Sequence, residues 1–297
     1  MRLPFLSRPP TRAPSAKEFA VDFEEKRAVE AYENSDRSPF FAPGYTAYKE
    51  RLILSVMRDE EWRAAFRNGN ELPANYGVRL DERVVEYPWV FSRLRAGGGL
   101  IIDAGSTFNK KRLLESEFLR ERTLLVYTLN TDWITLNNRV SYLFGDLRDM
   151  ILKDNVASSI VCISTLEHVG FTYEYETYSQ RNPWPAADPE SYRAAVREFR
   201  RLLEPGGQLL LTVPYGRYEN HGWLQQFDAA RIAAIVDEFS GELKALTYYR
   251  YHRDGWRLAS AEECAELEYF NIHERKSFDA DCAAAARGVA CLELIRA

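Results

Sequence analysis

The chain has 297 residues, of which 46% are hydrophobic, 13% aromatic and 28% charged, and its formal net charge is −5. This is the composition of a globular protein, and it excludes an overall disordered chain, a collagen-like or coiled-coil rod and a general nucleic-acid polycation. No apolar run approaches the roughly 20 residues needed to cross a bilayer, so no membrane span is expected.

The N-terminal third of the chain is predicted to be helical after a short tail. Residues 1–17 contain four prolines, which cannot donate to helix or sheet ladders, so we expect a flexible tail there. Residues 18–67 show apolar side chains at helical spacing, interrupted by the proline-rich segment Pro39–Gly44. We therefore expect residues 18–97 to form an N-terminal helical cap or substrate region. The sequence leaves open whether this region closes over a substrate or mediates a homodimer.

From Leu100 onward, short apolar runs alternate with segments of helical spacing. The runs that predict buried strands are 100–104, 123–129, 141–144, 158–164, 208–214, 243–251 and 288–295. Helical spacing is clearest over residues 188–203 and 228–239. The alternation predicts an α/β fold, with a Rossmann-like, seven-stranded, mostly parallel sheet and helices on both faces. In such a sheet a ligand binds at the carboxyl ends of the strands.

The cysteines do not indicate a metal site. Cys162, Cys264, Cys282 and Cys291 show no CxxC pairing and no histidine at metal-ligand spacing. Scattered thiols suit a reducing compartment, so we expect a cytoplasmic protein without a metal.

The first predicted strand ends in a turn that suits ligand binding, with the sequence Asp103-Ala-Gly105-Ser-Thr107. The glycine allows a close approach of the backbone, and the carboxylate can accept hydrogen bonds from a hydroxyl or ammonium group. Dinucleotide binding would require the G-x-G-x-x-G pattern, which is missing here, so a nicotinamide oxidoreductase is disfavoured. Alternatively, Asp103 could simply cap the turn that follows it.

Four segments resemble the class I S-adenosylmethionine-dependent methyltransferases, and they occur in the order typical of that family: residues 100–105, 142–149, 161–169 and 199–214. The last, with Pro205-Gly-Gly207 between a helix and a strand, is the most specific. The resemblance implies an S-adenosylmethionine-binding domain over residues 98–297, with the last strand antiparallel beside the fifth. It also implies that the cofactor is held by residues at the strand ends, namely Asp103, Ala104, Gly105, Ser106, Thr107, Asn130, Gly145, Asp146, Leu147, Ser164, Thr165 and Glu167.

A narrower resemblance, to bacterial methyltransferases associated with sugar and surface-polysaccharide synthesis, rests on residues 81–89, 103–107 and 218–223. It implies O-methylation of a sugar or glycan hydroxyl, or of another small molecule, and no nucleic-acid partner. The polar, aromatic loop after the fifth strand contains the candidate substrate-binding residues, which are Tyr215, Asn220 and Trp223. The first candidate for a general base is His221 and the second is His168. The alternative for this loop is an ordered segment packed on the next helix.

Two departures from the family pattern motivate a second hypothesis. Ser106-Thr107 follows Gly105 where further glycine is usual, and the second strand ends in Thr128-Leu-Asn130 without the acidic residue that grips the ribose. In addition, Asp146 could form an Asx turn, and Glu167 could begin a helix. The alternative function is therefore a non-catalytic methyltransferase-fold binding module in a biosynthetic assembly.

Overall fold

The computed structural model describes residues 16–34, 42–129, 139–171, 188–281 and 285–297. Its helices are α1 (Ala16–Glu33), α2 (Tyr45–Arg58), α3 (Glu60–Asn68), α4 (Arg83–Arg93), α5 (Lys111–Leu114), the 3₁₀ turn η1 (Leu166–His168), α6 (Tyr192–Leu202), α7 (Ala229–Phe239), α8 (Ala261–Cys264) and α9 (Ile272–Arg275). Its strands are β1 (Leu100–Ala104), β2 (Thr123–Thr128), β3 (Val140–Phe144), β4 (Ala157–Ile163), β5 (Leu203–Pro214), β6 (Glu219–Asn220), β7 (Gln225–Gln226), β8 (Glu242–His252), β9 (Gly255–Ala259) and β10 (Gly288–Ile295). Within the described ranges, no helix is both long enough and apolar enough to span a membrane.

The central sheet has the strand order β3-β2-β1-β4-β5-β10-β8-β9. The five strands from β3 to β5 are mutually parallel, whereas β10 is antiparallel to both of its neighbours, β5 and β8. The expected mostly parallel α/β sheet is therefore confirmed, and so is the last strand lying antiparallel beside the fifth.

The expected number of strands in this sheet is wrong: the sheet has eight strands, not seven. The additional strand is β9, which forms an antiparallel hairpin with β8 around the turn Arg253-Asp254-Gly255. An Asp-Gly pair between two extended segments is a hairpin signal. β9 is short and has the charged residue Arg257 at its centre, so it lacks the continuous apolar run of the other strands.

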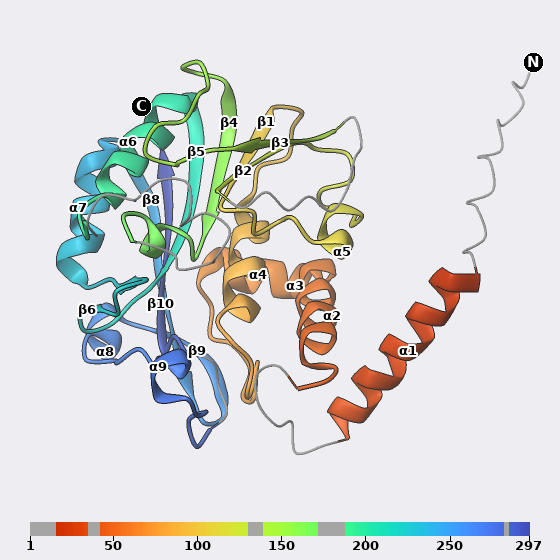
Figure 1. Cartoon of the computed structure of the whole chain (residues 1–297). Coiled ribbons are helices and arrows are strands. Elements are labelled where there is room, and N and C mark those ends of the chain that lie inside the picture. The colour runs from red at the N-terminus through yellow and green to blue at the C-terminus, as the bar shows by residue number, and fades with distance from the viewer. Residues whose placement is uncertain (1–15, 35–41, 130–138, 172–187, 282–284) are drawn as a thin grey trace, which may run out of the picture.

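Each central strand is buried on both faces, which explains its unbroken apolar run. On one face, Ile101 of β1 and Val161 of β4 belong to the same hydrophobic cluster as Trp89 of α4. On the opposite face, Ile102 belongs to a second cluster that contains Phe199 of α6. Figure 1 shows α6 and α7 on one side of the sheet and α2 to α4 on the other. The predicted helices on both faces are thus present.

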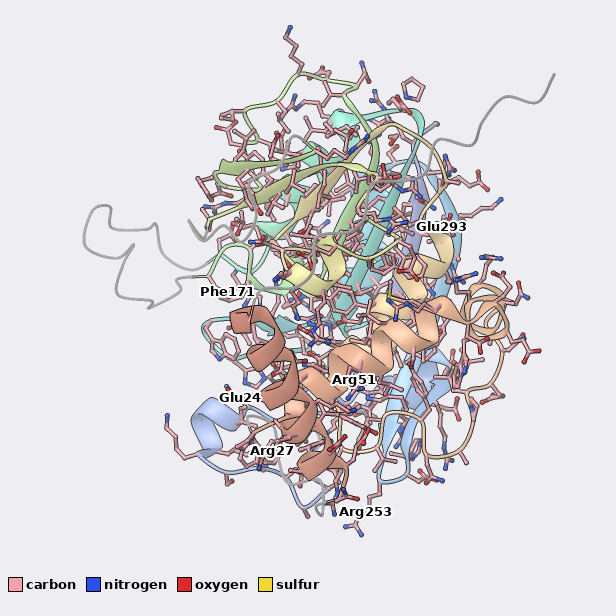
Figure 2. All side chains as sticks on the ribbon, turned by 90° about the vertical axis from the view of Figure 1, so that its right-hand side faces the viewer. Glu24, Arg27, Arg51, Phe171, Arg253 and Glu293 are labelled. Atoms are coloured by element: carbon pink, nitrogen blue, oxygen red, sulfur yellow. The ribbon has the colours of Figure 1, made fainter. Side chains whose placement is uncertain are left out.

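Helices α2 to α4 are packed into the body of the fold, and a cap over the sheet domain is not confirmed. Trp89 and Val90 of α4 are fully buried in the cluster that α4 shares with the sheet. Figure 2 looks onto this helical side and shows α1, which carries Glu24 and Arg27, beside α2, which carries Arg51. The boundary at residue 97 stays a prediction. The expected tail lies outside the described residues up to residue 15, and helix α1 begins at Ala16.

Candidate functional site

The turn after β1 is organised by Asp103, whose side chain is fully buried. Its Oδ1 accepts hydrogen bonds from the backbone N–H of Thr107 at 3.0 Å and from the Thr107 hydroxyl at 2.9 Å, and its Oδ2 accepts from the N–H of Phe108 at 2.8 Å. Burial raises the pKa of the Asp103 carboxyl to about 6, although these hydrogen bonds act to lower it. Both carboxylate oxygens are therefore used to shape the turn.

The turn is pressed against the end of β4. Gly105 has φ +113°, and a Cβ added to it would overlap the side chain of Thr165. Ser106 follows with φ +68°, so the left-handed conformation that favours glycine is kept here by a serine. The predicted site residue Gly105 therefore lies directly beside Thr165, although the two are 60 positions apart in the sequence.

The end of β4 is tied to α4 by a buried carboxylate. Glu86 Oε1 accepts hydrogen bonds from the Ser164 hydroxyl at 2.5 Å and from the Thr212 hydroxyl of β5 at 2.7 Å. Its Oε2 forms an ion pair with Arg83 Nη1 at 2.5 Å. Glu86 is fully buried, so this network holds the ends of β4 and β5 against α4.

Glu167, in the η1 turn that follows β4, differs from Glu86 in having one carboxyl oxygen without a partner, while its other oxygen lies 3.9 Å from His168 Nε2. Its side chain is only 4% exposed, and its Oε2 atom is buried without a hydrogen-bond partner among the described residues. Burial raises the pKa of this carboxyl well above its usual value. A buried oxygen of this kind is expected to bind a ligand or to hold a proton.

His168, the last residue of η1, contacts the loop after β5. Its Nδ1 lies 3.1 Å from the carbonyl oxygen of Trp223, and the two rings pack at 5.3 Å. A carbonyl can only accept, so Nδ1 carries the proton and donates it. Burial lowers the pKa of His168 to about 4, which keeps the imidazole neutral above that pH.

This lowered pKa should make folding stability depend on pH. The folded protein binds fewer protons at His168 than the unfolded chain does, so its contribution is complete above about pH 6.5 and is lost as the pH falls towards 4. The free energy of unfolding should fall between pH 7.5 and pH 5 in both proteins. We expect this fall to be about 2 kcal/mol smaller in His168→Gln than in the unaltered chain. Urea unfolding of both proteins at the two pH values measures this difference. Equal losses in the two proteins would contradict the prediction.

The turn after β3 contains the predicted residues Gly145, Asp146 and Leu147. Arg148 forms a bidentate pair with Asp146, with Nε 3.0 Å from each carboxylate oxygen and Nη2 2.6 Å from Oδ2. Burial acts to raise the pKa of Asp146, but the hydrogen bonds from Arg148 outweigh it and lower that pKa. Asp146 also accepts from the N–H of Arg148, which is the Asx-turn arrangement that the sequence left as an alternative.

The loop after β5 places its candidate residues in different surroundings. Tyr215 is 1% exposed and its ring packs on Tyr248, so it is part of the core. The other members line a cavity of about 640 Å³, which is formed by Glu219, Asn220, His221, Trp223, Asn271 and Glu274. In this cavity His221 Nε2 lies 3.5 Å from Glu219 Oε2, and the imidazole packs on Tyr269.

The structure thus brings together most predicted site residues at the carboxyl ends of β1, β3, β4 and β5. Asn130 lies outside the described residues. Groups of three or more residues able to hold a metal ion are not found in the part of the chain that the structure describes. Two residues of the site were not among the predicted site residues, Glu86 and Arg148. The signal for Glu86 was a charged residue inside the otherwise apolar stretch of α4.

Comparisons with known proteins give resemblances of fold only. No family model matches the chain, and a search of curated proteins finds no match. Similar solved structures include an S-adenosylmethionine-dependent methyltransferase from Mesorhizobium loti, with 12% identity, a TM-score of 0.44 and coverage of 71% of this chain and 97% of that chain. Another is the 1,6-didemethyltoxoflavin-N1-methyltransferase of Burkholderia thailandensis, with 12% identity, a TM-score of 0.43 and coverage of 97% and 93%. A third is the [4+2]-cyclase SpnF, with 16% identity, a TM-score of 0.47 and coverage of 87% and 97%. At this similarity they carry no information about the substrate of this chain.

Proposed function

We propose that this protein is an S-adenosylmethionine-dependent methyltransferase that methylates a hydroxyl group of a sugar, a glycan or a similar small molecule. The observation that carries the proposal is the convergence of three segments at the carboxyl edge of the sheet. The turn held by Asp103 touches Thr165, and His168, three residues on, touches Trp223 of the loop after β5. Glu167 lies between these two contacts.

The residues at this edge fit the proposed cofactor. S-adenosylmethionine carries positive charge on its sulfonium and amino groups, and the buried carboxyl of Glu167 has an oxygen without a partner in the described structure. The residues that would hold the cofactor are those of the Gly105–Thr107 turn, the Gly145–Leu147 turn and Glu167. Asp103 would act through the turn that it shapes, because its own oxygens are already engaged.

The chain's contribution to the reaction would be mainly positioning. The cofactor supplies an electrophilic methyl group when it is bound. Holding two reactants in line contributes on the order of 7–11 kcal/mol to barrier lowering. The Glu86 network fixes the segment from Ser164 onward, and the Trp223 contact fixes the loop that would present the methyl acceptor.

The cavity around His221 supports a hydroxylated methyl acceptor. Trp223 offers a flat apolar surface, and Asn220 and Glu219 offer hydrogen-bonding groups. His221 Nε2 has no hydrogen-bond partner among the described residues and lies 3.5 Å from Glu219 Oε2. That carboxylate would stabilise the imidazolium formed when His221 takes the proton that leaves the hydroxyl.

The test is an assay of S-adenosylhomocysteine release with a panel of monosaccharides, sugar nucleotides and oligosaccharides. We expect turnover with a hydroxylated compound, and we expect His221→Gln to reduce kcat roughly 100-fold or more. Glu71→Gln, at an exposed position outside the site, is the matched control and should leave kcat unchanged. The methyltransferase proposal fails if calorimetry detects no binding of S-adenosylmethionine.

One observation favours a second candidate, the non-catalytic binding module. Arg148 occupies both oxygens of Asp146, the carboxylate that would otherwise meet the cofactor's adenosine portion. Binding of S-adenosylmethionine without turnover of any compound in the panel would favour this candidate over the enzyme.

A further inference from the structure

Glu167 occupies the point where the proposed cofactor and methyl acceptor would meet. Two residues before it, Thr165 contacts the Gly105 turn, and one residue after it, His168 contacts the carbonyl of Trp223. Its side chain is 96% buried, and Oε2 has no hydrogen-bond partner among the residues that the structure describes. Glu167 therefore stands at the junction of two loops with part of its carboxyl group unused.

The titratable groups around Glu167 come from three elements. From α4 these are Arg83 and Glu86, and Glu82 directly precedes that helix. The titratable but uncharged groups are Cys162 of β4 and His168 of its own turn. The ion pair of Arg83 is made with Glu86, and Glu86 is also held by Ser164 and Thr212. The neighbouring cation is thus already engaged with another carboxylate.

A buried carboxylate without its own counter-ion is unfavourable, and such a group normally takes up a proton. The raised pKa of Glu167 reflects this burial. His168 cannot compensate, since its lowered pKa leaves it neutral. Burial consequently favours the protonated form of the Glu167 carboxyl in the ligand-free protein, and a cation placed beside it would favour loss of that proton.

We propose that Glu167 distinguishes S-adenosylmethionine from S-adenosylhomocysteine by exchanging its proton for the positive charge of the sulfonium. This inference rests on the proposed function. The two ligands share the adenosine and amino-acid portions, but only the methylated one carries the sulfonium charge. Binding of the substrate form then releases the proton of Glu167 to solvent, whereas the neutral thioether of the product leaves the proton in place. The protein would thereby favour the substrate over the spent product.

Calorimetric titration tests the proposal without any methyl acceptor. Both ligands are titrated into the full chain between pH 5.5 and 7.5, in buffers of different ionisation enthalpy, which reveals proton release. We expect S-adenosylmethionine to release up to about one proton more than S-adenosylhomocysteine. The ratio of their affinities should rise with pH by up to about tenfold per unit. Asp103, which titrates near pH 6, shapes a turn common to both ligands, so its effect cancels in the ratio.

Glu167→Gln should abolish the extra proton release and make the affinity ratio independent of pH. Retained binding of S-adenosylhomocysteine shows that the variant is folded, and Glu71→Gln should behave as the unaltered chain does. A ratio that does not change with pH in the unaltered chain overturns the proposal. So does a pH dependence that survives in Glu167→Gln but disappears in Glu82→Gln, because Glu82 would then be the exchanging group. If neither ligand binds the unaltered chain, the proposed function fails and this inference fails with it.

Discussion

Replacing Asp103 with alanine should weaken S-adenosylmethionine binding at least 100-fold. The carboxylate accepts three hydrogen bonds from the turn that would hold the cofactor, and it is fully buried. Charge-assisted hydrogen bonds contribute about 1.5–3 kcal/mol each, so the turn would lose its defined shape. Calorimetric titration at pH 7.5 measures the change, with circular dichroism to establish that the variant is folded.

Asp103→Asn is the matched control for this prediction. The amide keeps an oxygen that can accept from Thr107, but it places an NH₂ group against the N–H of Phe108, where two donors face each other. We expect an affinity between those of the unaltered chain and Asp103→Ala.

In the unaltered chain, binding should also weaken as the pH falls through about 6, where protonation turns one oxygen of Asp103 into a donor. Unchanged binding in Asp103→Ala would refute the role assigned to the turn.

Replacing Glu86 with alanine should lower the free energy of unfolding by about 3–5 kcal/mol, because removal of one partner leaves a charge buried and unpaired. Arg83 would lose its ion pair, and the hydroxyls of Ser164 and Thr212 would lose their acceptor. The measurement is urea unfolding followed by circular dichroism.

The control for Glu86→Ala is Glu190→Ala. Glu190 forms an ion pair with Arg193 at the same i,i+3 spacing, but the side chains of this pair are 48% and 35% exposed. Exposed pairs contribute about 0.2–1 kcal/mol, so the loss should be several-fold smaller. Equal losses at the two positions would show that the Glu86 network does not stabilise the fold.

The strands of the sheet were predictable wherever both faces are buried. Burial on two sides demands an unbroken apolar run, and β1 has that run at the predicted residues, Leu100–Ala104. β9 was missed because its sequence, Gly-Trp-Arg-Leu-Ala, belongs to an edge strand with a charged residue at its centre. A hairpin at a sheet edge is specified by its turn more than by its own hydrophobicity.

The candidate site was predictable at the level of segments but not of contacts. Asp103 lies at the end of β1 and Glu167 follows β4, so parallel topology alone places them at the same edge. The pairing of Asp146 with Arg148 was not anticipated, since a bidentate contact depends on side-chain conformations that spacing does not determine. Glu86 lies in the segment 81–89, which contributed only to the narrower family resemblance. Its contact with Thr212 joins residues 126 positions apart, and no local pattern indicates such a pairing.

The position of β10 has a consequence for how the chain folds. β10 separates β5 from β8, so the β8–β9 hairpin joins the parallel strands only through this strand. Pairing of Val289 with Pro214 and of Ile295 with Gln208 requires closure of a long intervening loop. Until that closure occurs, a partly folded molecule exposes the edges of both β5 and β8. Self-association through these two exposed edges would then compete with folding.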